Sequence, residues 1–120
     1  MTEENVKDHC NLDVLNAATL VENTRDRFVK DKIYTYISQL LIAVNPFKLI
    51  DGLYSDEQKE LYKGANWAQL EPHVYAIAEM SFQYMTIHNQ SQSLLVRAAA
   101  AAAHGSSSSA RQPPPQQQHD

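Results

Sequence analysis

The sequence predicts an α/β fold of about three helices and three strands, followed by a low-complexity tail. Three observations lead to this prediction. Three segments have helical features, three short runs are rich in β-branched, aromatic or aliphatic residues, and residues 98–120 contain no Leu, Ile, Val, Phe, Trp, Tyr or Met. The chain therefore divides into a polar N-terminal arm (1–10), a patterned part (11–97) and a tail rich in Ala, Ser, Pro and Gln (98–120), which we expect to be disordered.

Composition excludes several classes of protein. The chain has 120 residues, a formal net charge of −4 and a single cysteine. One cysteine excludes an intrachain disulfide scaffold and a Cys-rich zinc site, and the five histidines have no spacing typical of metal ligands. The polar N-terminus does not look like a secretory signal, the longest aliphatic run is too short to span a membrane, and a mildly acidic chain is a poor nucleic-acid binder. We expect a cytoplasmic protein.

The first helix is predicted over residues 17–30. Asn16 is a strong N-cap, because its side-chain oxygen accepts a free backbone N–H of the first turn. Apolar and small side chains then recur at helical spacing and predict the buried face: Ala17, Val21, Thr24 and Phe28. The charged residues between them are expected to face solvent: Glu22, Arg25, Asp26 and Arg27.

The next two elements are predicted strands that form a hairpin. Residues 33–37 are all β-branched or aromatic, and the aliphatic run 40–44 follows after two residues. A continuous aliphatic run is typical of a strand buried on both faces. Asn45-Pro46 ends the second strand, because proline cannot donate to a sheet ladder, and a loop is expected over 47–54.

Two further helices and a last strand complete the pattern. Ser55 predicts a cap for a helix over 56–63, which Gly64 ends. Pro72 fits the first turn of a third helix, whose side chains are apolar nearly all round. Residues 93–96 indicate a short strand directly before the tail.

Several blocks of this pattern occur together in one known family. They are "IYTYISQLLIAVNPFK", "LYSDEQKELYKG", "EPHVYAIAEMSFQYM" and "NQSQSLLV". In this order and spacing they resemble the early part of the myosin motor head, over residues 11–96. The resemblance implies an incomplete fragment of the myosin P-loop motor fold that stops just before the P-loop.

The resemblance also implies a binding site. In that family the loop after the second strand contacts the purine of ATP, and the matching positions here are Asn45, Pro46, Phe47, Lys48 and Tyr54. The family binds ATP with Mg²⁺ through G-x-x-x-x-G-K-[ST], whose backbone N–H groups and Lys hold the phosphates. Here the strand at 93–96 is followed by Arg97 and six alanines, and no Lys follows Lys63. We expect neither catalytic residues nor a metal site.

The function this implies is a truncated, myosin-like motor-domain protein without motor or ATPase activity of its own. The intact family is an actin-binding, ATP-driven cytoskeletal motor whose partners are actin filaments and light chains. One alternative is the N-terminal piece of a genuine full-length myosin, associated with the cytoskeleton. A second is a non-catalytic interaction module or decoy. The tail is open to four interpretations: a linker, a Pro/Gln-rich interaction segment, a translated intron or a shifted reading frame.

Overall fold

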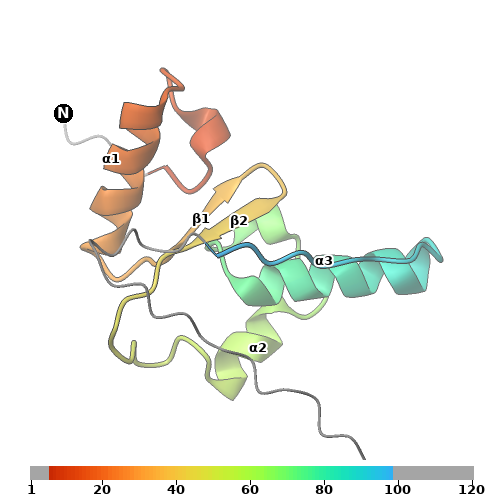
Figure 1. Ribbon diagram of the computed structural model, residues 1–120. Coiled ribbons are helices and arrows are strands. Elements are labelled where there is room, and N and C mark those ends of the chain that lie inside the picture. Colours follow the sequence, from red (N-terminus) through yellow and green to blue (C-terminus); the bar gives the residue numbers. More distant parts are fainter. Residues whose placement is uncertain (1–5, 99–120) are drawn as a thin grey trace, which may run out of the picture.

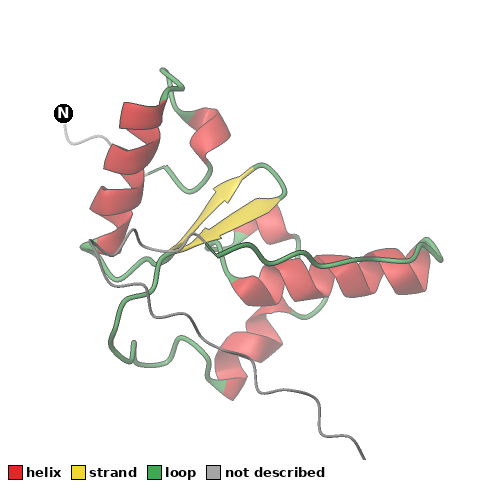
Figure 2. Ribbon diagram, viewed as in Figure 1, coloured by secondary structure: helices red, strands yellow, loops and turns green. Residues whose placement is uncertain are grey.

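The computed structural model describes residues 6–98, and the expected tail over 98–120 lies outside this range apart from its first residue. Figures 1 and 2 show α-helices arranged around a short hairpin. The elements are α1 (Ala17–Phe28), β1 (Tyr34–Ile37), β2 (Leu40–Ala43), α2 (Asp56–Tyr62) and α3 (Val74–Ile87), with 3-10 turns at His9–Asn11 and Trp67–Gln69. The predicted mixed α/β class is confirmed, with three helices and two strands among the described residues.

The hairpin is antiparallel, as predicted. Tyr34 pairs with Ala43, and Ile37 pairs with Leu40 at the turn. Ser38 adopts a left-handed φ of 54°, and its backbone N–H donates to Asp8 Oδ1 at 3.1 Å. The side chain of Asp8 therefore fixes the turn that sets the hairpin register.

The described part of the polar N-terminal arm, residues 6–10, is held against the hairpin. Asp8 forms a parallel bridge with Tyr36, whose backbone N–H donates to the Lys7 carbonyl at 2.9 Å. The side chain of His9 is fully buried, and its ring nitrogens contact Asn23 and Thr24 of α1. Polar composition indicated exposure, but the polar groups of these residues find hydrogen-bond partners within the fold. Their backbone also adds one more segment beside the hairpin.

The buried face of α1 also differs from the prediction. The helix begins at the expected cap, where Asn16 accepts from Thr19 and Thr19 bonds back in a capping box. Its buried residues, however, are Asn23 and Arg27, whereas Val21 is 58% exposed. The Asn23 side chain pairs with both backbone groups of Val6, so α1 packs on polar backbone rather than on an apolar layer.

A small core joins β1, α2 and α3. Tyr36, Tyr62 and Ala76 form its centre. Ser55 caps α2 as predicted, and Gly64 follows that helix with φ 64°. Pro72 does not lie in the first turn of α3, because His73 is the N-cap and its ring accepts from the Tyr75 N–H. Proline therefore precedes the cap.

Two predictions about strands are wrong. The residues of β2 are half-buried or exposed rather than buried on both faces, and Leu40 is 68% exposed. Residues 93–96 form no strand, and Leu95 is 94% exposed. In Figure 1 this segment, coloured blue, turns back from the far end of α3. Within the described residues no further strand lies beside β2, so the sheet ends at that edge.

Candidate functional site

The candidate site is the loop that joins β2 to α2, drawn in yellow in Figure 1. Its first part is a tight turn in which the Asn45 side-chain oxygen accepts from the Phe47 N–H at 2.9 Å. Pro46 fixes the backbone between them. Phe47 has a φ of 52°, and its ring is 91% exposed. The turn therefore presents an aromatic ring to solvent.

Lys48 lies next to this turn but points to another element. Its ammonium group lies 2.6 Å from a carboxylate oxygen of Asp31, just after α1. Both side chains are about half exposed, so the ion pair contributes little to stability. It does hold the loop near the end of α1.

Tyr54 ends the loop and is held by side chains from other elements. Its hydroxyl lies 2.5 Å from the hydroxyl of Tyr34 on β1. Its ring packs edge-on against His73 and Tyr75, with centroids 5.6 and 6.0 Å away. Tyr54 is nevertheless 53% exposed, so one side of the ring remains accessible.

The structure brings together only some of the residues that the sequence assigned to the site. Asn45 and Phe47 share one turn, Lys48 pairs with Asp31, and Tyr54 joins an aromatic cluster at the start of α3. Among the described residues no hydrogen bond links Tyr54 to the turn. The five positions therefore lie on one loop but in two separate groups.

Sequence reasoning missed two residues that support this loop, Tyr34 and His73. Tyr34 is 8% exposed, and burial followed by its bond to Tyr54 raises the pKa of its phenol strongly. His73 is 1% exposed, and its Nε2 lies 2.8 Å from the Leu53 carbonyl. A histidine directly after a proline and before a helical pattern is a signal for a ring that caps the helix.

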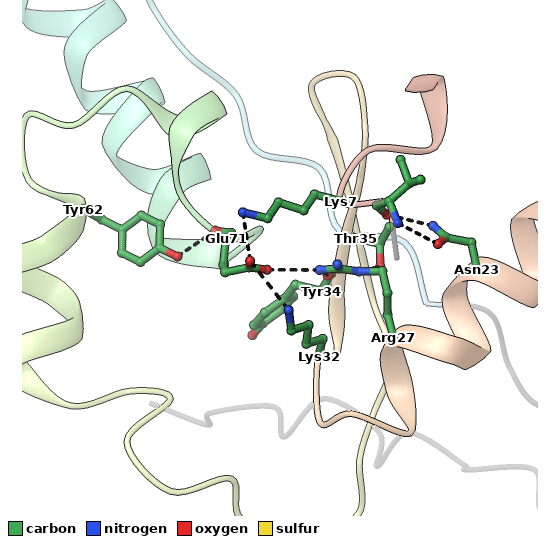
Figure 3. Close-up of polar contacts among 9 residues, drawn as sticks. Lys7, Asn23, Arg27, Lys32, Tyr34, Thr35, Tyr62 and Glu71 are labelled. Carbon is green, nitrogen blue, oxygen red and sulfur yellow. Dashed lines mark hydrogen bonds and ion pairs between the residues drawn. The ribbon is translucent and has the colours of Figure 1, made fainter. Parts of the chain in front are cut away.

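A charged cluster around Glu71 links the N-terminal arm, α1 and the segment before β1 to the segment that leads into α3 (Figure 3). Its carboxylate lies 2.9 Å from Lys7 Nζ, 3.5 Å from Arg27 Nη2 and 3.7 Å from Lys32 Nζ. Burial alone raises the pKa of Glu71, but the bond from Lys7 and the charges of Lys32, Lys7 and Arg27 outweigh it and leave the pKa lowered. The carboxylate is therefore charged near neutral pH.

The described residues offer other shallow hollows away from this loop. One, of about 370 Å³, lies between the hairpin turn and the second half of α3 and is lined by Gln39, Trp67 and Met80, among others. Within residues 6–98 no group of three or more His, Cys, Asp or Glu is placed to hold a metal ion. No helix among them is long and apolar enough to cross a membrane.

Comparisons with a family model and with curated proteins point to the same family. The family model for the myosin head (motor domain) matches residues 6–110. Myosin heavy chain 95F of Drosophila melanogaster is 44% identical over 89 residues, which is 74% of this chain and 7% of that protein. Human unconventional myosin-VI is 43% identical over 95 residues, or 79% of this chain and 7% of that protein. Unconventional myosin-IXAa of Danio rerio is 39% identical over 89 residues. The chain thus spans less than a tenth of the length of these relatives.

Proposed function

We infer the function of this chain from its family: it belongs to the myosin heads, the motor domains of cytoskeletal motor proteins. We propose that it forms the purine side of the nucleotide site of an ATP-binding motor head. We further propose that the 120-residue polypeptide by itself does not hydrolyse ATP. The observation that carries the first proposal is the exposure of two aromatic rings, Phe47 and Tyr54, on one loop.

The chemistry of this loop suits a flat base. Aromatic rings stack on purines or pack against their edges, and a phenol hydroxyl hydrogen-bonds a ring nitrogen or an exocyclic amine. Phe47 and Tyr54 supply such groups, while the Asn45-Pro46 turn fixes the backbone that carries Phe47. Asn45, Pro46, Phe47, Lys48 and Tyr54 are accordingly our proposed purine-contacting residues.

The described residues do not fit the phosphates or Mg²⁺. Phosphate binding in this family of folds needs glycine-permitted backbone N–H groups, a lysine and a metal-binding hydroxyl. The printed sequence has no G-x-x-x-x-G-K-[ST], and residues 6–98 hold no cluster for a metal ion. We therefore derive no hydrolytic step from this chain.

The whole motor is a separate proposal, because the chain spans only a small part of each relative. A longer protein that contains this sequence would be an actin-binding, ATP-driven motor associated with the cytoskeleton, with light chains as further partners. Sequencing transcripts across the Val96 codon tests this. An isoform that continues into a Gly-rich turn with a lysine would support it, and finding only the printed tail would contradict it.

The purine contact is tested by adenosine titration of the ¹⁵N-labelled 120-residue chain. We expect shifts confined to amides of residues 45–55 at millimolar adenosine, because a base held on one side binds weakly. Ribose 5-phosphate is the control ligand and should give none of these shifts. Phe47→Ala should abolish the response, whereas Phe82→Ala on α3 should retain it. Shifts scattered over the chain, or no shifts, would contradict the contact.

The absence of hydrolysis is tested separately. We expect no phosphate release above background from the purified chain with Mg-ATP, with or without actin filaments. Actin-stimulated release from this polypeptide would show that the proposal is wrong.

A second candidate function, a non-catalytic interaction module, is favoured by exposed apolar side chains. They lie on β2, the outer half of α3 and the segment after it: Leu40, Phe82, Ile87, Leu94, Leu95 and Val96. The edge of β2 also carries no charge or proline, the features that protect sheet edges from pairing with other chains. Sedimentation velocity tests this reading, since it predicts concentration-dependent association that Leu40→Lys reduces. A monodisperse monomer at high concentration would exclude self-association.

A further inference from the structure

The end of the proposed purine loop is held by two residues that lie outside it. Tyr34 comes from β1, and its hydroxyl lies 2.5 Å from the hydroxyl of Tyr54. His73 comes from the start of α3, and its Nε2 donates to the carbonyl oxygen of Leu53 at 2.8 Å. One contact therefore holds the tip of the Tyr54 side chain, and the other holds the backbone one residue before it.

The hydrogen bonds of His73 define one tautomer. Its Nδ1 accepts from the Tyr75 N–H at 2.9 Å, so the proton lies on Nε2, which then donates to Leu53. The ring lies among aromatic residues, with centroids 5.2 Å from Tyr34 and from Tyr62 and 4.3 Å from Tyr75. A fixed tautomer in a packed ring cluster gives the Leu53 carbonyl a partner in a defined place.

Tyr34 is likewise fixed. It is 8% exposed and sits in β1 opposite Ala43, so packing and the hairpin register set the position of its hydroxyl. Tyr54, in contrast, is about half exposed and lies in the turn over residues 51–54 that ends the loop. The buried Tyr34 therefore sets the place of the more exposed Tyr54.

We propose that Tyr34 and His73 are positioning residues that hold Tyr54 in the orientation in which it contacts a purine base. This rests on the proposed function, in which Tyr54 belongs to the purine loop. The two residues touch no ligand themselves. They act through the Tyr54 hydroxyl and the Leu53 carbonyl.

Three conservative substitutions separate positioning from general packing. Tyr34→Phe keeps the ring and removes only the hydroxyl. His73→Asn keeps a good helix cap, because Asn also accepts from the first turn, but its shorter side chain does not reach Leu53. Tyr62→Phe is the matched control, since the Tyr62 hydroxyl donates to the Glu71 carbonyl at 2.6 Å and not to the loop.

The test is amide hydrogen exchange of the full 120-residue chain by NMR. The Leu53 and Ser55 N–H groups flank Tyr54 and donate to Ile50 and Gly52. The Leu20 N–H of α1 is the reference, so a ratio of rates removes any loss of global stability. The Tyr75 N–H reports whether the cap of α3 survives.

We expect Tyr34→Phe and His73→Asn each to raise the Leu53 and Ser55 rates roughly threefold to tenfold relative to Leu20, the effect of one lost hydrogen bond. Tyr62→Phe should leave this ratio unchanged, and Tyr75 should stay protected in His73→Asn. Unchanged ratios in both loop variants, or an equal change in Tyr62→Phe, would overturn the proposal. Repeating the experiment with adenosine separates the two ideas. Suppose that adenosine leaves the Leu53 and Ser55 exchange rates of the wild-type chain unchanged, while Tyr34→Phe and His73→Asn still raise them. The purine contact is then contradicted, and the positioning of Tyr54 by Tyr34 and His73 is retained.

Discussion

Arg27 and Glu71 are 44 positions apart in the sequence and meet in an ion pair, with Arg27 Nη2 3.5 Å from Glu71 Oε2. The arginine side chain is 1% exposed, while that of Glu71 is 44% exposed. The same guanidinium donates to the Tyr34 carbonyl at 2.8 Å and to Thr35 Oγ1 at 3.0 Å. One buried cation thus ties α1 to β1 and to the segment that leads into α3.

Removing the charge of Glu71 should destabilise the fold. Glu71→Gln keeps the size of the side chain but leaves the cations Lys7, Arg27 and Lys32 without their shared carboxylate. We expect the free energy of unfolding to fall by about 1–3 kcal/mol, measured by urea denaturation at pH 7 and low protein concentration. The control is Glu22→Gln, an exposed carboxylate on α1. Equal effects of the two substitutions would contradict a structural role for this cluster.

Stability should fall as the pH is lowered through the range in which histidine titrates. His9 and His73 are almost fully buried, and burial is the main cause that lowers the pKa of each. For His9, the charge of Asp8 opposes this and that of Arg27 adds to it. The unfolded chain then binds protons more readily, so the unfolding free energy is constant above about pH 7 and declines below about pH 6.5.

Urea denaturation between pH 5 and 8 checks this expectation. His73→Asn removes one titrating group while keeping a cap on α3, so it should reduce the slope below pH 6.5. The rings of four tyrosines surround His73: Tyr34, Tyr54, Tyr62 and Tyr75. A stability that is flat from pH 5 to 8 would contradict neutral buried histidines.

The cap of α1 gives a prediction on which sequence and structure agree. Asn16 accepts from the Thr19 N–H at 3.0 Å, and the Asn16 N–H donates to the Thr19 hydroxyl at 3.1 Å. Asn16→Ala should reduce the unfolding free energy by about 1 kcal/mol, whereas Asn16→Ser should retain most of it. Thermal or urea unfolding checks this. If Asn16→Ser lowers the unfolding free energy as much as Asn16→Ala does, the loss of the side-chain cap is not the cause of the destabilisation.

The sequence predicted those features that depend on neighbouring residues. The caps at Asn16 and Ser55, the hairpin and the glycine after α2 all follow from local chemistry, and the structure has them. It also carried enough ordered blocks to indicate the family. Element type and turn chemistry are decided within a few residues, so periodicity and cap residues are sufficient to predict them.

The failures concern contacts between distant residues. Arg27 was expected to face solvent. It is buried together with Asn23, because α1 packs on backbone that only the tertiary fold brings there. His9 is buried for the same reason. The prediction of a strand over 93–96 was wrong for a related reason. Residues of high β-propensity form a strand only when a neighbouring strand completes their hydrogen bonds.

The sequence indicated the loop of the candidate site, but it did not indicate the residues that hold this loop in place. The loop itself follows from the resemblance to a family, which indicated Asn45 to Lys48 and Tyr54. Tyr34 and His73 were not indicated, because their contacts with residues 53 and 54 cross 20 positions of sequence. Such pairs are visible only once the hairpin and the start of α3 are packed together.

The last prediction concerns Phe47, whose backbone is strained and whose ring is too exposed for burial to offset that strain. A bulky residue in the left-handed region costs about 1 kcal/mol, and with a ring 91% exposed little burial offsets that cost. Phe47→Asn should therefore raise the unfolding free energy by about 0.5–1 kcal/mol, since Asn tolerates this region. The same change at Phe82, which is 55% exposed in α3, should give no gain because the helical backbone there is unstrained. If Phe47→Asn is more stable and yet loses the response to adenosine, the strain at Phe47 is retained for the ring it presents. A loss of stability would instead show that the ring packs against the fold.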